Sequence, residues 1–521
     1  MGVKILFLVL FFGIMIGVGI YSRKHATNVN DFVLGGRGVG PWLTAFAYGT
    51  SYFSAVVFVG YAGQFGYKYG IAATWIGIGN AFIGALFAWL LLARRTRIMS
   101  KHMNSATMPD FFGKRFQSKS IKIVASIIVF VFLIPYTSSV YNGLSRLFGM
   151  AFDIPYEVCV IVMAVLTGLY VILGGYMATA LNDFIQGIIM LVGIVLVIAA
   201  VLSGKGGFTE AIRQLATIDS DTLMTAGQKG AYTSFFGPDP MNLLGVVILT
   251  SLGTLGLPQM IHKFYAIKDD RSIRTGTIIS TLFSIIISGG CYFLGGFSRL
   301  FDSSTIHTKT GAVIYDAIIP AMLSNLPDIL IGVVVVLVLS ASMSTLSALV
   351  LTSSSTLTLD LIKGNIIKKM NDKKQLTCMR IFVLFFIVLS VLIALDPPTF
   401  IAQLMGISWG ALAGAFLAPY LYSLYWKGVT RSAVWISFIS GVGITVTNLF
   451  FKFIESPINA GAIAMIAGLI TVPIISLITP KMNRKYVDHV FQCIDHEKAA
   501  KKRIEQEFSE KVAFCQLESE I

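Results

Sequence analysis

Long apolar runs separated by short polar segments dominate the pattern of this chain. A bilayer-spanning helix needs about 20 apolar residues, and these runs are continuous, whereas the strands of a membrane β-barrel alternate between polar and apolar positions. We therefore predict an all-α polytopic membrane protein with thirteen transmembrane helices, near residues 3–22, 42–67, 71–93, 121–149, 155–174, 180–203, 240–260, 275–298, 326–361, 379–395, 399–425, 432–451 and 459–479.

Composition and charge support this prediction and exclude two other classes of protein. Of the 521 residues, 55% are hydrophobic and 13% are charged, whereas a soluble chain carries about 25% charged residues. The net charge of +14 comes from Lys and Arg between the apolar runs, as at 94–97 and 373–374. Such residues mark cytoplasmic loops, so we expect a lipid bilayer as partner and no nucleic acid. We predict that the N-terminus lies outside and the C-terminus in the cytoplasm, because this orientation places most of the Lys and Arg residues on the cytoplasmic side.

Two of the predicted spans are interrupted by glycine, proline and hydroxyl residues. One interruption lies within 43–55 around Gly49, and the other lies within 249–259, which contains Gly253, Gly256 and Pro258. Paired interruptions in two halves of a chain are typical of inverted repeats with a transporter's binding site between them. We predict a first helix and cytoplasmic loop (1–41), a five-helix repeat (42–203), an extracellular loop (204–239), a second five-helix repeat (240–425), two additional helices (426–480) and a cytoplasmic tail (481–521).

The span near 326–361 is unusually rich in hydroxyl groups, with eleven Ser and Thr among residues 340–358. Ser344, Thr345 and Ser347 lie within one turn, and the carbonyl of Ala341 lies on the same side. A single such hydroxyl often bonds its own helix backbone. The density here favours a site for a small cation, because hard cations prefer oxygen ligands.

Asp183 lies near the start of the predicted span 180–203. A carboxylate inside a membrane is costly and is a functional candidate by default; a position near the cytoplasmic membrane interface is the alternative explanation. Gln186 shares its helix face.

Five ordered motifs resemble those of the sodium:solute symporter family, whose members include proline, pantothenate, sugar, monocarboxylate and sialic acid carriers. The motifs span about residues 3–480 and look closest to the proline and pantothenate branch; they lie at 30–41, 108–116, 182–187, 256–266 and 341–347. The resemblance implies a leucine-transporter-type 5+5 inverted repeat with flanking helices, and sodium-driven uptake of a small-molecule solute across the plasma membrane. The co-transported ion would be Na+, and we expect no organic cofactor.

The resemblance also implies positions for the ions and the solute. The main sodium site would use the carbonyls of Thr50, Phe53 and Ala341 with the hydroxyls of Ser344 and Thr345. A second sodium site would use Asp183, Ser344 and Ser347, but Ala348 stands where sialic acid carriers supply a further hydroxyl. The solute pocket would be lined by Ser51, Tyr52, Ser54, Tyr136, Thr250 and Thr254.

The identity of the solute stays open at this stage. Proline carriers have an aspartate where this chain has Tyr52, a tryptophan at Val56, and aromatic residues at Thr250 and Thr254. Proton-coupled transport through Asp183 is the alternative within transport. A membrane sensor or an intramembrane enzyme is the alternative from another class, but the six histidines lie outside the predicted spans. The oligomeric state and the role of the charged tail also stay open.

Overall fold

The computed structural model describes residues 2–22, 28–367 and 369–496. In this part of the chain the structure is helical, and its only β-pairing consists of three isolated bridges. The helices that form the body are α1 (Gly2–Ser22), α3 (Pro41–Tyr52), α4 (Ala62–Tyr69), α5 (Thr74–Gly79), α8 (Lys119–Phe152), α9 (Tyr156–Ser203), α11 (Pro240–Gly253), α12 (Pro258–Tyr265), α13 (Asp270–Ser284), α14 (Gly290–Gly295), α16 (Asp328–Thr356), α17 (Asp372–Leu395), α18 (Ile401–Tyr425), α19 (Arg431–Phe451) and α20 (Pro457–Ile478).

Shorter segments extend or connect these helices. The π-helical segments are η3 (Val56–Tyr61), η5 (Asn80–Phe87), η6 (Trp89–Ala93), η8 (Ile285–Gly289) and η12 (Leu357–Ile362). Short α-helices are α2 (Val29–Leu34), α6 (Arg94–His102), α7 (Met108–Arg115), α10 (Phe208–Ala216) and α15 (Ile318–Leu323). The 3₁₀ segments are η2 (Gly35–Arg37), η4 (Gly70–Ala73), η7 (Ala231–Thr233), η9 (Ser298–Phe301), η10 (Ser304–Ile306) and η11 (Tyr315–Ala317).

Eleven helices of the described chain are long and apolar enough to cross a membrane. The predicted count of thirteen is therefore not confirmed, although each predicted apolar run is helical. The difference has two causes. The run of helix from Val56 to His102 is continuous and contains the later part of the predicted span 42–67 together with all of the predicted span 71–93. The helix Tyr156–Leu169 is shorter than a full span.

The two interruptions expected from the sequence are breaks in the structure. α3 ends at Tyr52 and η3 begins at Val56, a few residues beyond the centre of the predicted interruption. α11 ends at Gly253 and α12 begins at Pro258, which occupies the first turn of the helix, where a missing N–H costs nothing. A further irregularity occurs at Gly175, whose φ of 53° and ψ of −152° divide α9 into two helical parts. That kink corresponds to the boundary between the predicted spans 155–174 and 180–203.

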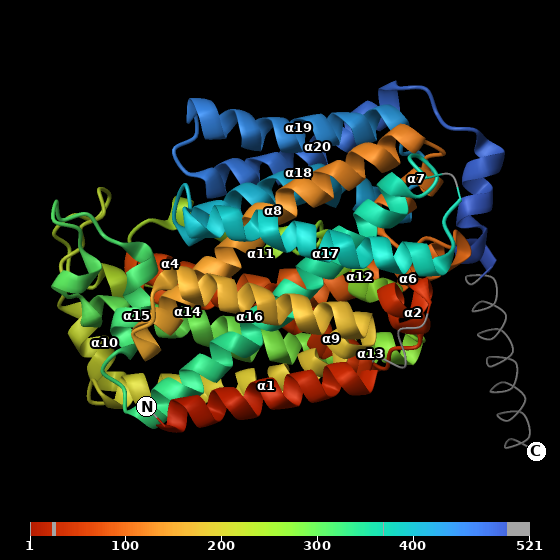
Figure 1. Ribbon diagram of the computed structural model, residues 1–521. Coiled ribbons are helices and arrows are strands. Elements are labelled where there is room, and N and C mark those ends of the chain that lie inside the picture. The colour runs from red at the N-terminus through yellow and green to blue at the C-terminus, as the bar shows by residue number, and fades with distance from the viewer. Residues whose placement is uncertain (1, 23–27, 368, 497–521) are drawn as a thin grey trace, which may run out of the picture.

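Helices α16 and α18 form the interior of the bundle. Of the most apolar window in each helix, 78% is buried in α16 and 94% in α18, whereas only 22% is buried in α1. α16 packs against α3, α8, α9 and α17, and it lies in the middle of the bundle in Figure 1. The peripheral helices expose large apolar side chains, among them Val9, Val192, Leu392 and Ile439, which is the arrangement expected of helices that face lipid.

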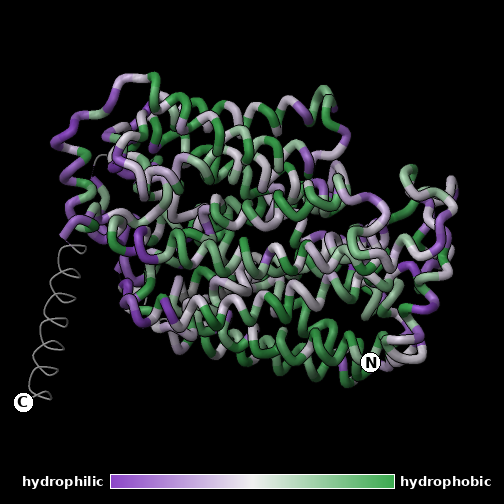
Figure 2. Tube along the Cα trace, turned by 180° about the vertical axis from the view of Figure 1, so that it is seen from behind, coloured by the Kyte–Doolittle hydropathy of each residue, from purple (hydrophilic) through white to green (hydrophobic). Residues whose placement is uncertain are grey.

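Hydrophilic residues gather at the two ends of the bundle, with an apolar region between them, as Figure 2 shows. α1 begins at one of these ends, and the last described helix, residues 484–496, lies at the opposite end in Figure 1. The basic residues of α6 lie at the end occupied by residues 484–496, where His102 Nε2 donates a hydrogen bond to the backbone oxygen of His489 at 2.9 Å.

Candidate ion and solute site

The break after α3 leaves backbone carbonyls without helical partners in the middle of the bundle. Phe53 has an extended backbone (φ −89°, ψ 113°), so the ladder of helical hydrogen bonds stops there. The carbonyls of Thr50 and Phe53 are consequently available to groups outside their own helix. Carbonyls released at a broken membrane helix are stable only where other groups replace the lost donors.

Hydroxyl groups of α16 supply these donors. Ser344 Oγ donates to the Thr50 oxygen at 2.8 Å and to the Ala341 oxygen at 3.0 Å. Thr345 Oγ1 lies 3.2 Å from the Thr50 oxygen, 3.2 Å from the Phe53 oxygen and 3.1 Å from the Ala341 oxygen. The five oxygens proposed from the family resemblance therefore converge in one place, and Thr50, Ala341, Ser344 and Thr345 are each fully buried.

This cluster of oxygens carries no formal charge. It consists of three carbonyls and two hydroxyls, and the described residues contain no group of three or more His, Cys, Asp or Glu side chains that could hold a metal ion. A multivalent metal site draws on carboxylate, imidazole or thiolate ligands. Neutral oxygens in a buried position suit a monovalent cation that must also be able to leave.

Asp183 does not join this cluster. Its Oδ2 lies 3.4 Å from the ammonium nitrogen of Lys263 on α12, and both side chains are almost entirely buried. Ser347 Oγ donates to the Ser344 oxygen of its own helix at 2.8 Å. Within the described chain, no hydrogen bond links Asp183 to either serine. The structure thus places an ammonium group, which the sequence reasoning did not identify, beside the carboxylate proposed for a second sodium.

The residues proposed for the solute pocket lie near the two breaks, but several of their hydroxyls bond to backbone. Thr250 Oγ1 donates to the Val246 oxygen at 2.9 Å, and Ser51 donates to the Ala47 oxygen. Thr254 Oγ1 donates to the oxygen of Ser251 at 2.9 Å and lies 3.0 Å from the oxygen of Gly84 on η5.

The three remaining residues predicted for the pocket are Ser54, Tyr136 and Tyr52, and each has different surroundings. Ser54 Oγ accepts from the Val56 amide at 3.2 Å, and Tyr136 on α8 is fully buried. Tyr52 ends α3, and its side chain lies outside the described part of the chain.

Trp409 of α18 is a central residue that the sequence reasoning missed. Its ring packs edge-to-face against Tyr136 with centroids 5.9 Å apart, and a Cβ at Gly253 would lie 2.7 Å from it. It therefore connects α8 with the second break. Its indole N–H is buried and has no acceptor among the described residues, which is unfavourable unless a ligand supplies one. A lone tryptophan in an otherwise Gly- and Ala-rich span was the available signal.

Comparison with known proteins identifies the family. The sequence profile of the "Sodium:solute symporter family" matches residues 32–441. The chain belongs to this family. It is 30% identical over 484 residues to the osmoregulated proline transporter OpuE of Bacillus subtilis (strain 168), covering 91% of this chain and 94% of that protein. It is also 30% identical over 498 residues to the sodium/proline symporter of Staphylococcus aureus (strain JH9), covering 91% and 92%.

A solved structure shares the fold of this symporter. A Na+-coupled sialic acid symporter, solved in a substrate-bound outward-open state, superposes with a TM-score of 0.75 over 92% of this chain and 98% of that one, at 15% sequence identity. The all-helical, leucine-transporter-type architecture expected from the sequence is thus confirmed, as is sodium-coupled solute transport in a multi-pass membrane protein. The division into repeats and the residues of the sites remain predictions.

Proposed function

We propose that this symporter imports a small organic solute across the plasma membrane by alternating access, with one sodium ion bound by the five converging oxygens. The supporting observation is the cluster itself, in which Ser344 and Thr345 of α16 meet the freed carbonyls after α3. A sodium ion coordinated by these five oxygens would take the place of the hydrogen bonds that now connect them. The two hydroxyl groups would keep their protons and turn their oxygens toward the ion.

Such a site would connect ion binding to conformation. α3 and α16 are separate elements of the bundle, and the amide of Ala55 beside the break also donates to Ser342 Oγ at 3.2 Å. An ion that binds oxygens of both elements favours the arrangement in which they are close together. Differential affinity for two arrangements is the physical requirement for coupling.

The energy available from one sodium ion is sufficient for strong accumulation. Moving one charge through 100 mV supplies about 2.3 kcal/mol, and a tenfold sodium gradient adds about 1.4 kcal/mol. Together these sustain accumulation of roughly 500-fold for a solute without net charge.

The Asp183–Lys263 pair supports a stoichiometry of one sodium per solute. An ammonium 3.4 Å from the carboxylate already provides the positive charge that a second sodium would bring. Breaking a buried ion pair by removing one partner is strongly unfavourable, so a sodium ion would have to displace Lys263 before binding there. Ala348 further reduces the number of hydroxyls near that position.

A small amino acid is the first solute to test. Two similar bacterial proteins are named as proline transporters, and Tyr136 and Trp409 provide an aromatic surface with a free indole N–H at the centre. The positions Tyr52, Val56, Thr250 and Thr254 lack the side chains implied for proline carriers. Proline therefore belongs in a panel with other amino acids, monocarboxylates and vitamin-like solutes.

Uptake into proteoliposomes tests the proposal directly. Purified full-length protein should accumulate at least one solute of the panel when an inward sodium gradient is imposed, and replacing sodium by choline at constant pH should abolish accumulation. Accumulation driven equally well by a proton gradient in choline would instead support proton coupling through Asp183. Failure to accumulate any solute under a sodium gradient would contradict the proposal.

A further inference from the structure

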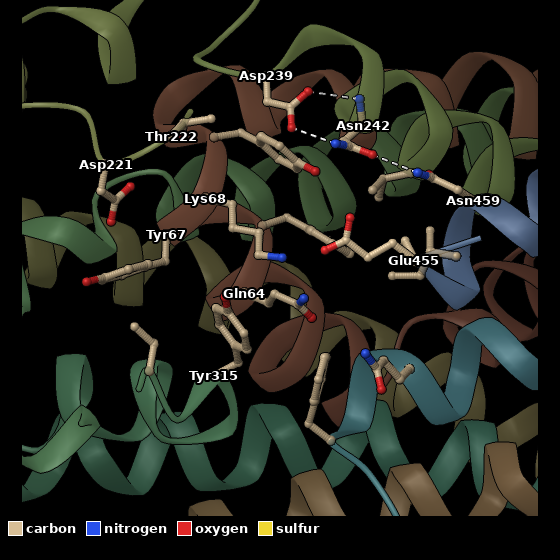
Figure 3. A pocket seen from close by; sticks show the side chains of 18 of the residues that line it. Gln64, Tyr67, Lys68, Asp221, Thr222, Asp239, Asn242, Tyr315, Glu455 and Asn459 are labelled. Atoms are coloured by element: carbon tan, nitrogen blue, oxygen red, sulfur yellow. Dashed lines mark hydrogen bonds between the residues drawn. The ribbon is translucent and has the colours of Figure 1, made fainter. Parts of the chain in front are cut away.

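A cavity lies away from the five-oxygen cluster, at the end of the molecule where α1 begins. Its volume is about 550 Å³, which is within the usual range for small-molecule sites. Its walls come from α4, η11, the loop before α11, the start of α18 and the loop before α20. Figure 3 shows the side chains around this space, which we call the outer cavity.

Most of the charged groups around the outer cavity have partners. Arg299 donates to Asp221 at 2.8 Å and to the oxygen of Tyr67 at 2.7 Å. Asp239 accepts from the amide of Asn242 at 3.2 Å and from its side-chain nitrogen at 2.6 Å. The charged groups of these residues therefore already have partners within the walls of the cavity.

Two groups of opposite charge, those of Lys68 and Glu455, have no such partners among the described residues. Within the described chain, neither the ammonium of Lys68 nor the carboxylate of Glu455 forms a hydrogen bond or an ion pair. The ammonium lies over the ring of Tyr315, 5.1 Å from its centroid. Lys68 is half-buried and Glu455 is exposed at the rim. Both point into the same space in Figure 3.

Gln64 adds a buried polar group to the same space. It precedes Lys68 by one helical turn on α4 and is 3% exposed. Its Oε1 has no hydrogen-bond partner among the described residues, although it lines the cavity and points into it in Figure 3. Leaving a buried acceptor unsatisfied costs about 1–3 kcal/mol when nothing else compensates. A polar ligand in the cavity would satisfy it.

We propose that the outer cavity is a binding site for zwitterions of amino-acid size, separate from the five-oxygen cluster and independent of sodium. Lys68 binds the ligand's carboxylate, Glu455 binds its ammonium group, and Gln64 accepts an N–H. Phe65 and Phe400 line the same cavity and contact the apolar part of the ligand. A monocarboxylate or a sugar would leave one of the two charged groups without a partner.

Two aromatic residues lie along the chain between the central site and the outer cavity. Tyr61 and Phe65 lie between the break after α3 and Lys68 in sequence, with their rings in edge-to-face contact at 4.9 Å. Phe65 also lines the outer cavity, so a zwitterion bound there would contact one ring of this aromatic pair. The identification of that zwitterion as the transported solute rests on the proposed function, whereas its binding does not.

Equilibrium binding to the purified full-length protein in choline medium, without sodium, tests this site. The labelled probe is L-proline, and the competitors are pyrrolidine and cyclopentanecarboxylate, which each keep the ring and one of the two charges. We expect proline to bind and each competitor to be weaker by about tenfold or more, because each loses one charge-assisted interaction. Equal binding of a singly charged analogue, or no sodium-independent proline binding, would overturn the proposal.

Variants assign the binding to the named residues. Lys68→Gln and Glu455→Gln should each raise the dissociation constant for proline about tenfold, whereas Lys309→Gln, an exposed residue outside the cavity lining, should leave it unchanged. Glu455 is exposed, so its substitution provides a readout even where Lys68→Gln impairs folding. Binding that survives both substitutions would place the site elsewhere. Failure of sodium-driven uptake, measured separately, would contradict the proposed function and leave this result intact.

Discussion

Two hydroxyls, those of Ser344 and Thr345, supply the only side-chain oxygens proposed for the sodium site. Replacing both by Ala removes two of the five oxygens from a position that is fully buried, where no bulk water can substitute for them. We expect the sodium concentration for half-maximal uptake to rise at least about tenfold. The measurement is sodium-dependent uptake of a transported solute by reconstituted protein.

A matched substitution on the same helix separates ion binding from helix stability. Ser354 is also buried in α16, and its hydroxyl donates to the Leu351 oxygen at 3.2 Å. Ser354→Ala should leave the sodium dependence unchanged. Equal sodium dependence in the double variant and the wild type would show that the ion binds elsewhere.

The ammonium of Lys263 makes a second prediction at the scale of single residues. In the wild type, sodium activation of uptake should be hyperbolic, with a Hill coefficient near one. Lys263→Gln leaves the Asp183 carboxylate buried without a counter-charge, a state that costs about 3–5 kcal/mol. We expect a second sodium ion to be recruited there and sodium activation to become sigmoidal.

Two further variants control this experiment. Lys263→Arg keeps the positive charge and should retain a Hill coefficient near one. The double variant with Asp183→Asn and Lys263→Gln removes both charges and should return the Hill coefficient to near one. A reversal-potential measurement that gives two sodium ions per solute in the wild type would contradict the assignment of Lys263 as the counter-charge.

At the scale of helices, the sequence predicted the elements better than their contacts. The apolar runs and both interruptions were predictable, because hydrophobic length and helix-breaking residues act locally. The α16 hydroxyls were predictable as a cluster because they are close in sequence. The pairing of Asp183 with Lys263 was not predictable, because Lys263 lies on α12, far away in the chain. The contact of the Thr254 hydroxyl with the Gly84 oxygen was not predictable either, because η5 is far away in the chain.

The start of α18 provides a prediction about pH. Asp316 lies in η11, outside the membrane-spanning helices, and accepts the amide of Ile401, the first residue of α18, at 3.3 Å. Burial raises the pKa of Asp316 from its ordinary value of 3.8 to about 6, and the Ile401 amide and Arg146 only partly oppose this shift. The folded protein therefore holds this proton more tightly than the unfolded chain does. Its stability should fall by up to about 3 kcal/mol as the pH rises from about 4 to above 6.

The variant Asp316→Asn isolates this contribution. An amide oxygen can still accept from Ile401 but does not titrate, so the pH-dependent loss of stability should be smaller in the variant. Thermal unfolding in detergent over this pH interval, compared between the two proteins, provides the measurement. Parallel curves for variant and wild type would mean that Asp316 has an ordinary pKa.

For the whole molecule, the distribution of charge separates the middle of the bundle from its ends. The broken region of α3 and α16 holds neutral oxygens, and the buried carboxylate of Asp183 is compensated by Lys263. Charged residues are concentrated at the two ends, where they pair with one another or bind backbone oxygens, as Arg95 does with Leu424 at 2.6 Å. A centre without net charge allows an ion and a solute to enter and leave without a large electrostatic penalty.

The orientation of the molecule in the membrane is the last prediction. The basic residues of α6 and the end of α7 lie at one end of the bundle with residues 484–496, and α1 begins at the other. Because Lys and Arg of short loops are retained in the cytoplasm, we expect the N-terminus outside and residues 484–496 inside. Leu223, 99% exposed in the loop before α11, and Arg484, whose side chain is 96% exposed, report on the two sides. In intact cells a membrane-impermeant maleimide should label Leu223→Cys and should label Arg484→Cys only after permeabilisation, each compared with the parent protein to account for the native cysteines. Labelling of Arg484→Cys alone in intact cells would reverse the orientation and would place the outer cavity on the cytoplasmic side.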